Sequence, residues 1–259
     1  MLNLIDTHSH IHNSEDFDIS INEIITNAKK ANINKIITVG TDVEDSKRAL
    51  ELAREYEQVY VTVGIHPNVY QDQSVDELEN LIIQIKESKN ASNLVGLGDI
   101  GLDYHYKPFD RLKQIKWFEG QLELALKYNL PVSFHVREAF KDFWPIFDEF
   151  NGLKGTLHSY TDNLDNMQKA LERDLYISVN GIITFNNVSE LNKVFIQLPL
   201  NRVIFETDAP YLAPKPYRGK KNQPAYVDEI ADYFAKQRGI SLNEISEITI
   251  KNTYDLFDL

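Results

Sequence analysis

Short runs of β-branched and other apolar residues recur along the chain, and each ends at a polar residue or a glycine. Runs of this length and composition are typical of buried strands. We predict eight strands, at residues 3–7, 35–40, 59–64, 94–99, 131–135, 155–158, 175–180 and 202–208. A longer stretch usually follows each run, with apolar residues at helical spacing as in 77–83. Strand and helix therefore alternate along the chain.

The helical stretches number seven between the strands and two after the last one. They cover residues 21–31, 43–56, 75–88, 111–128, 139–150, 164–173, 188–197, 225–237 and 242–256, and Ser74 is a candidate cap for the third. Strict alternation predicts a parallel sheet, and eight repeats are the number in a (β/α)8 barrel of the TIM type. A doubly wound open sheet usually has fewer strands and a glycine-rich first turn, whereas the first strand here ends in His-Ser-His. No linker interrupts the pattern, so we expect one domain over residues 1–259.

Composition narrows the class of protein. Hydrophobic residues make up 42% of the chain and charged residues 25%, which is ordinary for a globular protein with a sizeable core. No apolar run is long enough to span a membrane, and the chain starts with a strand pattern instead of a signal peptide. Cysteine is absent, so disulfides and thiolate ligands are excluded. We expect a cytoplasmic protein with no membrane association and no obligate protein partner.

Seven histidines occur, and each lies at or just beyond the carboxyl end of a predicted strand. In a barrel these ends open onto one face, where active sites lie. The predicted metal ligands at these strand ends are His8, His10, Asp99, His135, His158 and Asp208. Six nitrogen and oxygen ligands exceed the need of one tetrahedral ion. We therefore expect one or two divalent ions (Zn, Mg or Mn), and the net charge of −12 suits a site that concentrates cations.

Six motifs extend this pattern along nearly the whole chain. They read DTHSH at 6–10, GIHP at 64–67, GDIGLDY at 98–104, PVSFHVR at 131–137, ETDAPYLAP at 206–214 and RGKKNQPAYV at 218–227. With these motifs the sequence resembles the TatD-related metal-dependent deoxyribonucleases, a branch of the amidohydrolase-like hydrolases. The resemblance implies cleavage of DNA phosphodiester bonds, in some members as a 3′-to-5′ exonuclease. It implies the same six ligands, and it makes Asp208 the general base as well.

Two positions depart from the family pattern. The strand-four motif of the family normally has glutamate where this chain has Asp99, and that glutamate bridges two metals. Aspartate is one methylene shorter, so its carboxylate reaches about 1.5 Å less far. We expect a deeper ion pair or a weaker second site. The segment after His158 also differs, because Ser159 and Tyr160 stand where the family often has Cys-Phe.

Candidate substrate contacts surround the predicted ligands. His66 is either a donor to a substrate phosphate or a loop anchor, and Arg137 is either a phosphate contact or part of a salt bridge at the rim. The basic run 215–221, which includes Arg218 and Lys220, follows the last strand, and a phosphate partner is our expectation for it. Nucleobases would stack on Tyr211 if it faces the site, although aromatic residues at strand ends more often pack.

Three further residues near the predicted ligands are expected to have supporting roles. Glu206 either holds a ligand histidine through its second N–H or pairs with an arginine. Asp103 is expected to orient its loop, and His105 is expected to stack with a neighbouring tyrosine.

The sequence thus predicts a hydrolase in which metal-activated water attacks the phosphodiester bond of DNA or an oligonucleotide. Two alternatives remain. In the first alternative the same barrel would hydrolyse C–N or ester bonds, as an amidohydrolase or an aminoacyl-tRNA deacylase does. The chemistry of activated water does not by itself select phosphorus over carbon. The other alternative is a catalytically weak metal-binding barrel, which the Asp99 departure allows.

Overall fold

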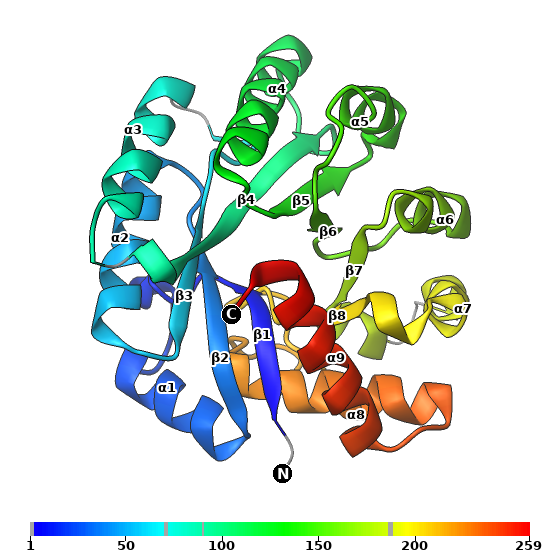
Figure 1. Ribbon diagram of the computed structural model, residues 1–259. Helices are drawn as coiled ribbons and strands as arrows, with labels where there is room; N and C mark the ends of the chain where they lie inside the picture. The colour runs from blue at the N-terminus through cyan, green and yellow to red at the C-terminus, as the bar shows by residue number, and fades with distance from the viewer. Residues whose placement is uncertain (1–2, 70–71, 90, 186–188) are drawn as a thin grey trace. The chain divides into compact units, whose positions relative to one another are not determined.

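The computed structural model describes residues 3–69, 72–89, 91–185 and 189–259. Within these ranges strands and helices alternate from the first strand to the eighth (Figure 1). The strands are β1 Leu4–Ser9, β2 Ile33–Val39, β3 Val59–Val63, β4 Leu94–Asp103, β5 Val132–Arg137, β6 Gly155–Leu157, β7 Tyr176–Val179 and β8 Val203–Phe205. The helices are α1 Ile21–Lys30, α2 Val43–Glu55, α3 Val75–Lys86, α4 Arg111–Tyr128, α5 Phe140–Phe147, α6 Leu164–Glu172, α7 Ser189–Gln197, α8 Val227–Arg238 and α9 Leu242–Phe257.

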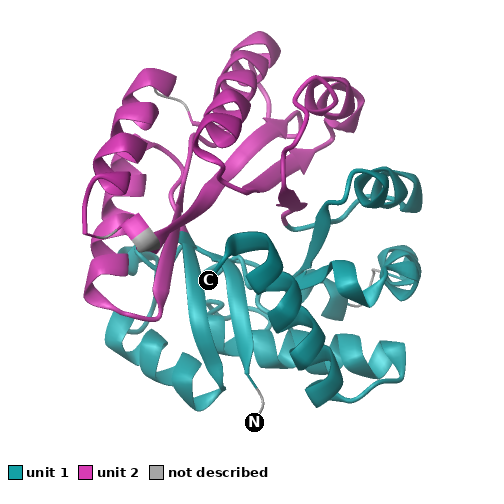
Figure 2. Cartoon of the chain, viewed as in Figure 1, with its two compact units in different colours: residues 1–38, 159–259 teal, residues 39–158 magenta. Residues whose placement is uncertain are grey.

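The chain divides into two compact units (Figure 2). Unit 1 comprises residues 1–38 and 159–259, and unit 2 comprises residues 39–158. In unit 2, β3 pairs with β4, β4 with β5 and β5 with β6, all in parallel. In unit 1, β1 pairs with β2 and β7 with β8. The pairings join consecutive parallel strands, as the predicted barrel requires.

The first and last strands also meet inside unit 1. Ser9 forms a parallel bridge with Ala209, the N–H of Asp208 donates to the carbonyl of His8 at 2.8 Å, and the hydroxyl of Thr7 donates to the carbonyl of Phe205. Contact between strand one and strand eight is what distinguishes a closed barrel from an open sheet. It also brings the carboxyl ends of β1 and β8 next to each other.

Local signals in the sequence explain several helix boundaries. The hydroxyl of Ser20 accepts the N–H of Glu23 while Glu23 accepts the N–H of Ser20, which is a complete capping box at the start of α1. The predicted cap of α3 is confirmed, because the Ser74 hydroxyl accepts the N–H of Glu77. Most predicted boundaries lie within two residues of the observed ones, and residue 188 of the predicted seventh helix lies outside the described residues.

Two predicted strands differ from the structure where they carry site residues. The fourth continues from the predicted end at Asp99 to Asp103, because Ile100 to Asp103 pair with Phe134 to Arg137. The eighth ends at Phe205, so Asp208 lies in the segment that follows it. Glycines at 98 and 101 weaken the strand pattern in the sequence. For this reason the predicted fourth strand ended too early.

Gly101 is required by the close approach of two strands. Its φ is +150°, and a Cβ there would lie 1.9 Å from the carbonyl oxygen of His135. No other residue fits, so this glycine sets how closely β4 approaches the histidine of β5.

Aromatic packing holds β5 in unit 2. Phe134 contacts Phe118 of α4 and Phe143 of α5, with ring centroids 6.2 and 5.3 Å apart, and all three side chains are fully buried. Because side chains alternate along a strand, a Phe134 that is fixed against the helices directs His135 to the opposite face. None of the described helices has the length and continuous apolar character of a membrane span.

Candidate metal centre

The carboxyl end of β1 is fastened to the segment after β8 by a buried aspartate. Asp6 accepts the N–H of Thr207 at 2.8 Å and its hydroxyl at 2.6 Å, and also the N–H of His8. Burial raises the pKa of Asp6 well above its usual value, although these hydrogen bonds act in the opposite direction. The rings of His8 and His10 lie 5.2 Å apart edge to face, because side chains two residues apart on a strand point to the same side.

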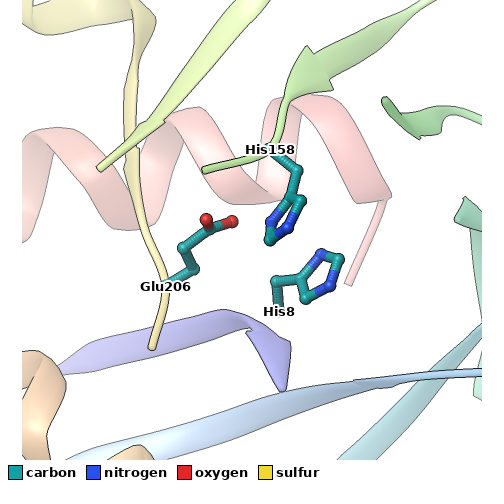
Figure 3. Close-up of side chains that lie close together, drawn as sticks. All are labelled: His8, His158 and Glu206. Atoms are coloured by element: carbon teal, nitrogen blue, oxygen red, sulfur yellow. The ribbon is translucent and has the colours of Figure 1, made fainter. Parts of the chain in front are cut away.

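A second carboxylate of unit 1 lies close to His8. A carboxylate oxygen of Glu206 and a ring nitrogen of His8 are within 4.8 Å, and Figure 3 shows both side chains. Glu206 is fully buried and accepts the N–H of Ser159 at 2.7 Å. Ser159 is bonded to His158, the last residue of unit 2. Glu206 thus fixes the backbone directly after a predicted ligand. The two interpretations from the sequence, a hydrogen bond from a ligand histidine and a pair with an arginine, stay predictions.

Asp208 lies beside His10 in unit 1. Its Oδ1 is 3.6 Å from Nε2 of His10, and its side chain is more exposed than that of His10, at 16% against 9%. Asp208 has a φ of +57° in a turn closed by the N–H of Tyr211, which donates to the Asp208 carbonyl. The carboxylate is therefore held next to a buried imidazole and keeps partial access to water. We call His8, His10, Glu206 and Asp208 the unit-1 cluster.

Unit 2 contains a matching group, the unit-2 cluster, made of His66, Asp99 and His135. Each residue offers one donor atom, and these atoms lie within 4.8 Å of one another. Oδ1 of Asp99 is 3.4 Å from Nδ1 of His135, and its Oδ2 is 3.8 Å from Nε2 of His66. Burial raises the pKa of Asp99, but the two histidines outweigh burial and hold the pKa well below its usual range.

Asp103 lies on the opposite side of the His135 ring, with Oδ2 at 3.0 Å from Nε2. Burial raises the pKa of Asp103, but the hydrogen bond and the charge of His135 outweigh burial and lower the pKa to about 2. An ionised carboxylate only accepts hydrogen bonds, so Nε2 of His135 carries a hydrogen, and in the neutral ring the lone pair is on Nδ1, the nitrogen on the side of Asp99. Burial lowers the pKa of His135, yet Asp99 and Asp103 raise it to about 9. This position therefore favours positive charge, whether a proton or a metal cation.

His66 has a different tautomer. Its Nδ1 accepts the backbone N–H of Asn68 at 3.1 Å, so a neutral ring carries its hydrogen on Nε2, the atom that faces Asp99. His66 is thereby a hydrogen-bond donor at this edge of the cluster. The backbone N–H of His66 donates to the carbonyl of Thr41 at 2.8 Å, and this hydrogen bond anchors the loop after β3. Both expected interpretations of His66, donor and anchor, agree with these contacts.

His158 is buried at the end of β6. Its N–H donates to the carbonyl of Phe134 at 3.0 Å, and its ring centroid is 6.1 Å from that of His135. The structure of unit 2 therefore places the two predicted ligands from β5 and β6 on adjacent strands, side by side.

The two arginines predicted to contact substrate lie against aromatic rings. The guanidinium of Arg137 is 4.9 Å from the centroid of Tyr106 and donates to its hydroxyl at 3.1 Å. In unit 1 the guanidinium of Arg218 is 3.7 Å from the centroid of Phe185. Arg218 and Lys220 are exposed. An arginine stacked on a ring keeps its donors available at the ring edge, as phosphate binding requires.

The sequence interpretation gave Asp103 only part of its role. Asp103 was expected to orient its loop, and it does accept the N–H of His105, but it also fixes the tautomer of His135. Its signal in the sequence was its position at the end of the GDIGLDY motif. His105 contacts Tyr106 edge to face instead of stacking on it, with ring centroids 5.0 Å apart, and its Nδ1 lies 2.7 Å from Oε1 of Glu138. His12 is half-buried, with Nδ1 2.7 Å from the hydroxyl of Thr38.

Comparison with known proteins agrees with this geometry. The family model described as TatD related DNase matches residues 5–258. The chain belongs to this family. It is 34% identical over 256 residues to YabD of Bacillus subtilis, which is named an uncharacterized metal-dependent hydrolase, with 98% of each protein covered. It is 31% identical to the deoxyribonuclease Tat-D of Schizosaccharomyces pombe, with 96% of this chain and 89% of that protein covered.

A solved structure supports the fold of this TatD-related chain. YjjV, a TatD homologue from Escherichia coli, superposes with a TM-score of 0.89 at 27% identity, covering 99% of this chain and 98% of that one. Together with the alternating elements and the parallel pairings, this likeness establishes the (β/α)8 barrel that the sequence predicts.

Proposed function

We propose that this protein is a metal-dependent hydrolase that cleaves DNA phosphodiester bonds. Membership of the TatD-related family supports the proposal, and the S. pombe relative is named a deoxyribonuclease. The observation that carries it is the grouping of imidazoles and carboxylates, buried or half-buried, at the carboxyl ends of strands in each unit. In a (β/α)8 barrel these strand ends carry the active site, so we propose that each cluster serves catalysis.

The donor set fits divalent cations. The proposed ligands are those predicted from the sequence: His8, His10, Asp99, His135, His158 and Asp208. Nδ1 of a neutral His135 and the carboxylate oxygens of the ionised Asp99 are donor atoms that such an ion binds. One or two ions of Zn, Mg or Mn would supply Lewis acidity, lowering the pKa of water and polarising a phosphoryl oxygen.

Asp208 is the proposed general base. Its carboxylate is partly exposed, so a water molecule can approach it, and it lies 3.6 Å from Nε2 of His10. It takes the proton from the attacking water as the new bond to phosphorus forms; the bond from phosphorus to the leaving ester oxygen breaks, and that oxygen takes a proton from solvent. Positive φ at Asp208 and the hydrogen bond that closes its turn keep the carboxylate in place.

Four further residues are proposed to bind substrate. Nε2–H of His66 donates to a phosphate oxygen at the edge of the unit-2 cluster. Arg137 and Arg218, each supported by a ring, bind flanking phosphates through paired donors. Lys220 adds a positive charge to the same loop as Arg218. The net charge of −12 makes local basic groups the means by which this protein attracts a polyanion.

The test uses oligonucleotides labelled at the 3′ or the 5′ end, with metal-depleted protein supplied with Mg²⁺, Mn²⁺ or Zn²⁺. We expect metal-dependent release of labelled nucleotide, and Asp208→Asn should reduce kcat by about 100-fold or more, the usual size of a lost general base. Asp232→Asn, on the exposed surface of α8, is the matched control and should keep wild-type kcat. Release of ammonia or of a free amino acid without nucleotide release would favour the C–N or ester alternative. If the protein binds metal stoichiometrically but turns over no substrate, the result would favour the catalytically weak metal-binding barrel.

A further inference from the structure

Two glutamines of α4 are buried beneath the unit-2 cluster. Gln114 and Gln121 are 3% and 1% exposed, although glutamine side chains are mostly found at the surface. They are seven residues apart, which is two helical turns, so both side chains lie on the same face of α4. A buried amide costs free energy unless its donors and acceptor are satisfied, so the contacts of these two side chains show why they are there.

Gln121 hydrogen-bonds both the backbone N–H and the backbone carbonyl of Ile65. Its Oε1 accepts the N–H of Ile65 at 2.6 Å, and its Nε2 donates to the carbonyl of Ile65 at 3.1 Å and to that of Trp117. Ile65 follows the end of β3, where the sheet no longer supplies partners, and it directly precedes His66. Gln121 therefore replaces the missing strand neighbour at the residue before the proposed phosphate donor.

Gln114 makes the same arrangement one strand further on. Its Oε1 accepts the N–H of Asp103 and its Nε2 donates to the carbonyl of Asp103, both at 2.9 Å. Nε2 also lies 3.5 Å from Oδ1 of Asn68. Asp103 is the last residue of β4 and accepts Nε2–H of His135. Gln114 therefore fixes the backbone of the carboxylate that sets the tautomer of a metal ligand.

We infer that Gln114 and Gln121 are positioning residues, and that α4 uses them to place the two halves of the unit-2 cluster separately. Gln114 acts through Asp103 on His135 and thus on metal affinity, whereas Gln121 acts through Ile65 on His66 and thus on substrate. The inference rests on the proposed function for the substrate half only. Neither residue touches the reacting atoms, and neither belongs to a motif that the resemblance quotes.

The experiment replaces each glutamine by methionine, which has a similar length and no amide group. Gln114→Met should weaken Mn²⁺ or Zn²⁺ binding by about 10-fold or more, the usual loss when the support of a ligand is removed. Gln121→Met should leave the metal Kd within about 2-fold and lower kcat/KM on oligonucleotides, since the loss of one well-placed donor costs about 10-fold or more. Titration calorimetry on metal-depleted protein gives the first quantity, and steady-state kinetics gives the second.

Leu122→Ala is the matched control, because Leu122 is fully buried on the same helix and its side chain has no hydrogen-bonding group. It should lower Tm without changing the metal Kd. If both methionine variants change Kd only in proportion to their loss of Tm, as this control would, the inference is overturned. Retention of wild-type Kd by Gln114→Met also overturns it.

Amide hydrogen exchange keeps the test decisive for a variant that folds poorly. In metal-free protein Gln114→Met should accelerate exchange at Asp103 and leave Ile65 unchanged, and Gln121→Met should do the reverse. Equal acceleration at both amides would mean that α4 only stabilises the fold. Calorimetry and exchange need no nuclease activity, so these results stand even if the proposed substrate is wrong.

Discussion

Asp103→Asn is the change that tests the unit-2 cluster most directly. The carboxylate of Asp103 is fully buried and lies 3.0 Å from Nε2 of His135, so the substitution keeps the size of the side chain and removes its charge. The fixed tautomer of His135 is lost with that charge, because an amide either accepts or donates at this position. We expect the lone pair on Nδ1 to face Asp99 for only part of the time, and metal affinity to fall accordingly.

The structure gives the size of this effect. The drop in the pKa of Asp103 from 3.8 to about 2 corresponds to a preference for the charged form of about 2 kcal/mol, at roughly 1.4 kcal/mol for each pH unit. That free energy equals a factor of about 30 to 60 in an equilibrium constant. The usual loss for removing the hydrogen-bond partner of a ligand histidine is about 10- to 100-fold. We therefore expect the Kd for Zn²⁺ to rise by about 30-fold.

The assay is titration calorimetry of metal-depleted protein, with Asp142→Asn as control. Asp142 is also a hydrogen-bonded acid of unit 2, accepting from Tyr104 and Arg111, but it does not contact His135. The control should bind Zn²⁺ with the wild-type Kd. An unchanged Kd in Asp103→Asn, or an equal loss in the two variants, would refute the assignment of Asp103 as the partner that sets the tautomer.

The same pair predicts how the stability of the metal-free protein depends on pH. Because folding lowers the pKa of Asp103, its contribution is full above about pH 4 and is lost as the pH falls to about 2. Because folding raises the pKa of His135 to about 9, its contribution is full below about pH 6.5 and is lost as the pH rises through 9. The difference in Tm between wild type and Asp103→Asn should therefore be largest between about pH 4 and 6.5, and a difference that grows above pH 9 would contradict this.

Three further variants test the remaining assignments. The double variant His8→Ala, His10→Ala should keep its circular dichroism and lose bound metal and activity, and turnover at the wild-type rate would place the site elsewhere. Arg218→Gln with Lys220→Gln should raise KM for oligonucleotides and flatten its salt dependence, while a small phosphodiester reporter should be affected much less; equal losses would make the loop structural. Asp99→Glu should tighten the metal site served by the histidines of β5 and β6, as calorimetry measures, and a weaker site would show that the backbone already compensates for the shorter side chain.

The sequence by itself determined the fold class and most of the candidate ligands. Strand and helix periodicity follow from which side chains are buried, and that information is local. The number of repeats then predicted a barrel, and the position of each histidine after a strand predicted the face that carries the chemistry. His8, His10 and Asp208 were found in this way, because their order along the chain already says which strand presents them. The family resemblance added the proposed role of Asp208 and the proposed substrate.

Only the tertiary structure decided how these residues are supported. The extension of β4 through two glycines depends on its pairing with β5, because Gly101 in isolation reads as a break in a strand. The tautomer of His135 depends on Asp103, which is 32 residues distant in sequence. Gln114 and Gln121 carry no signal of their own, since glutamines on a helix are ordinarily exposed. Hydrogen bonds between distant segments exist only once the chain has folded, and they set the protonation and orientation of groups that the sequence merely names.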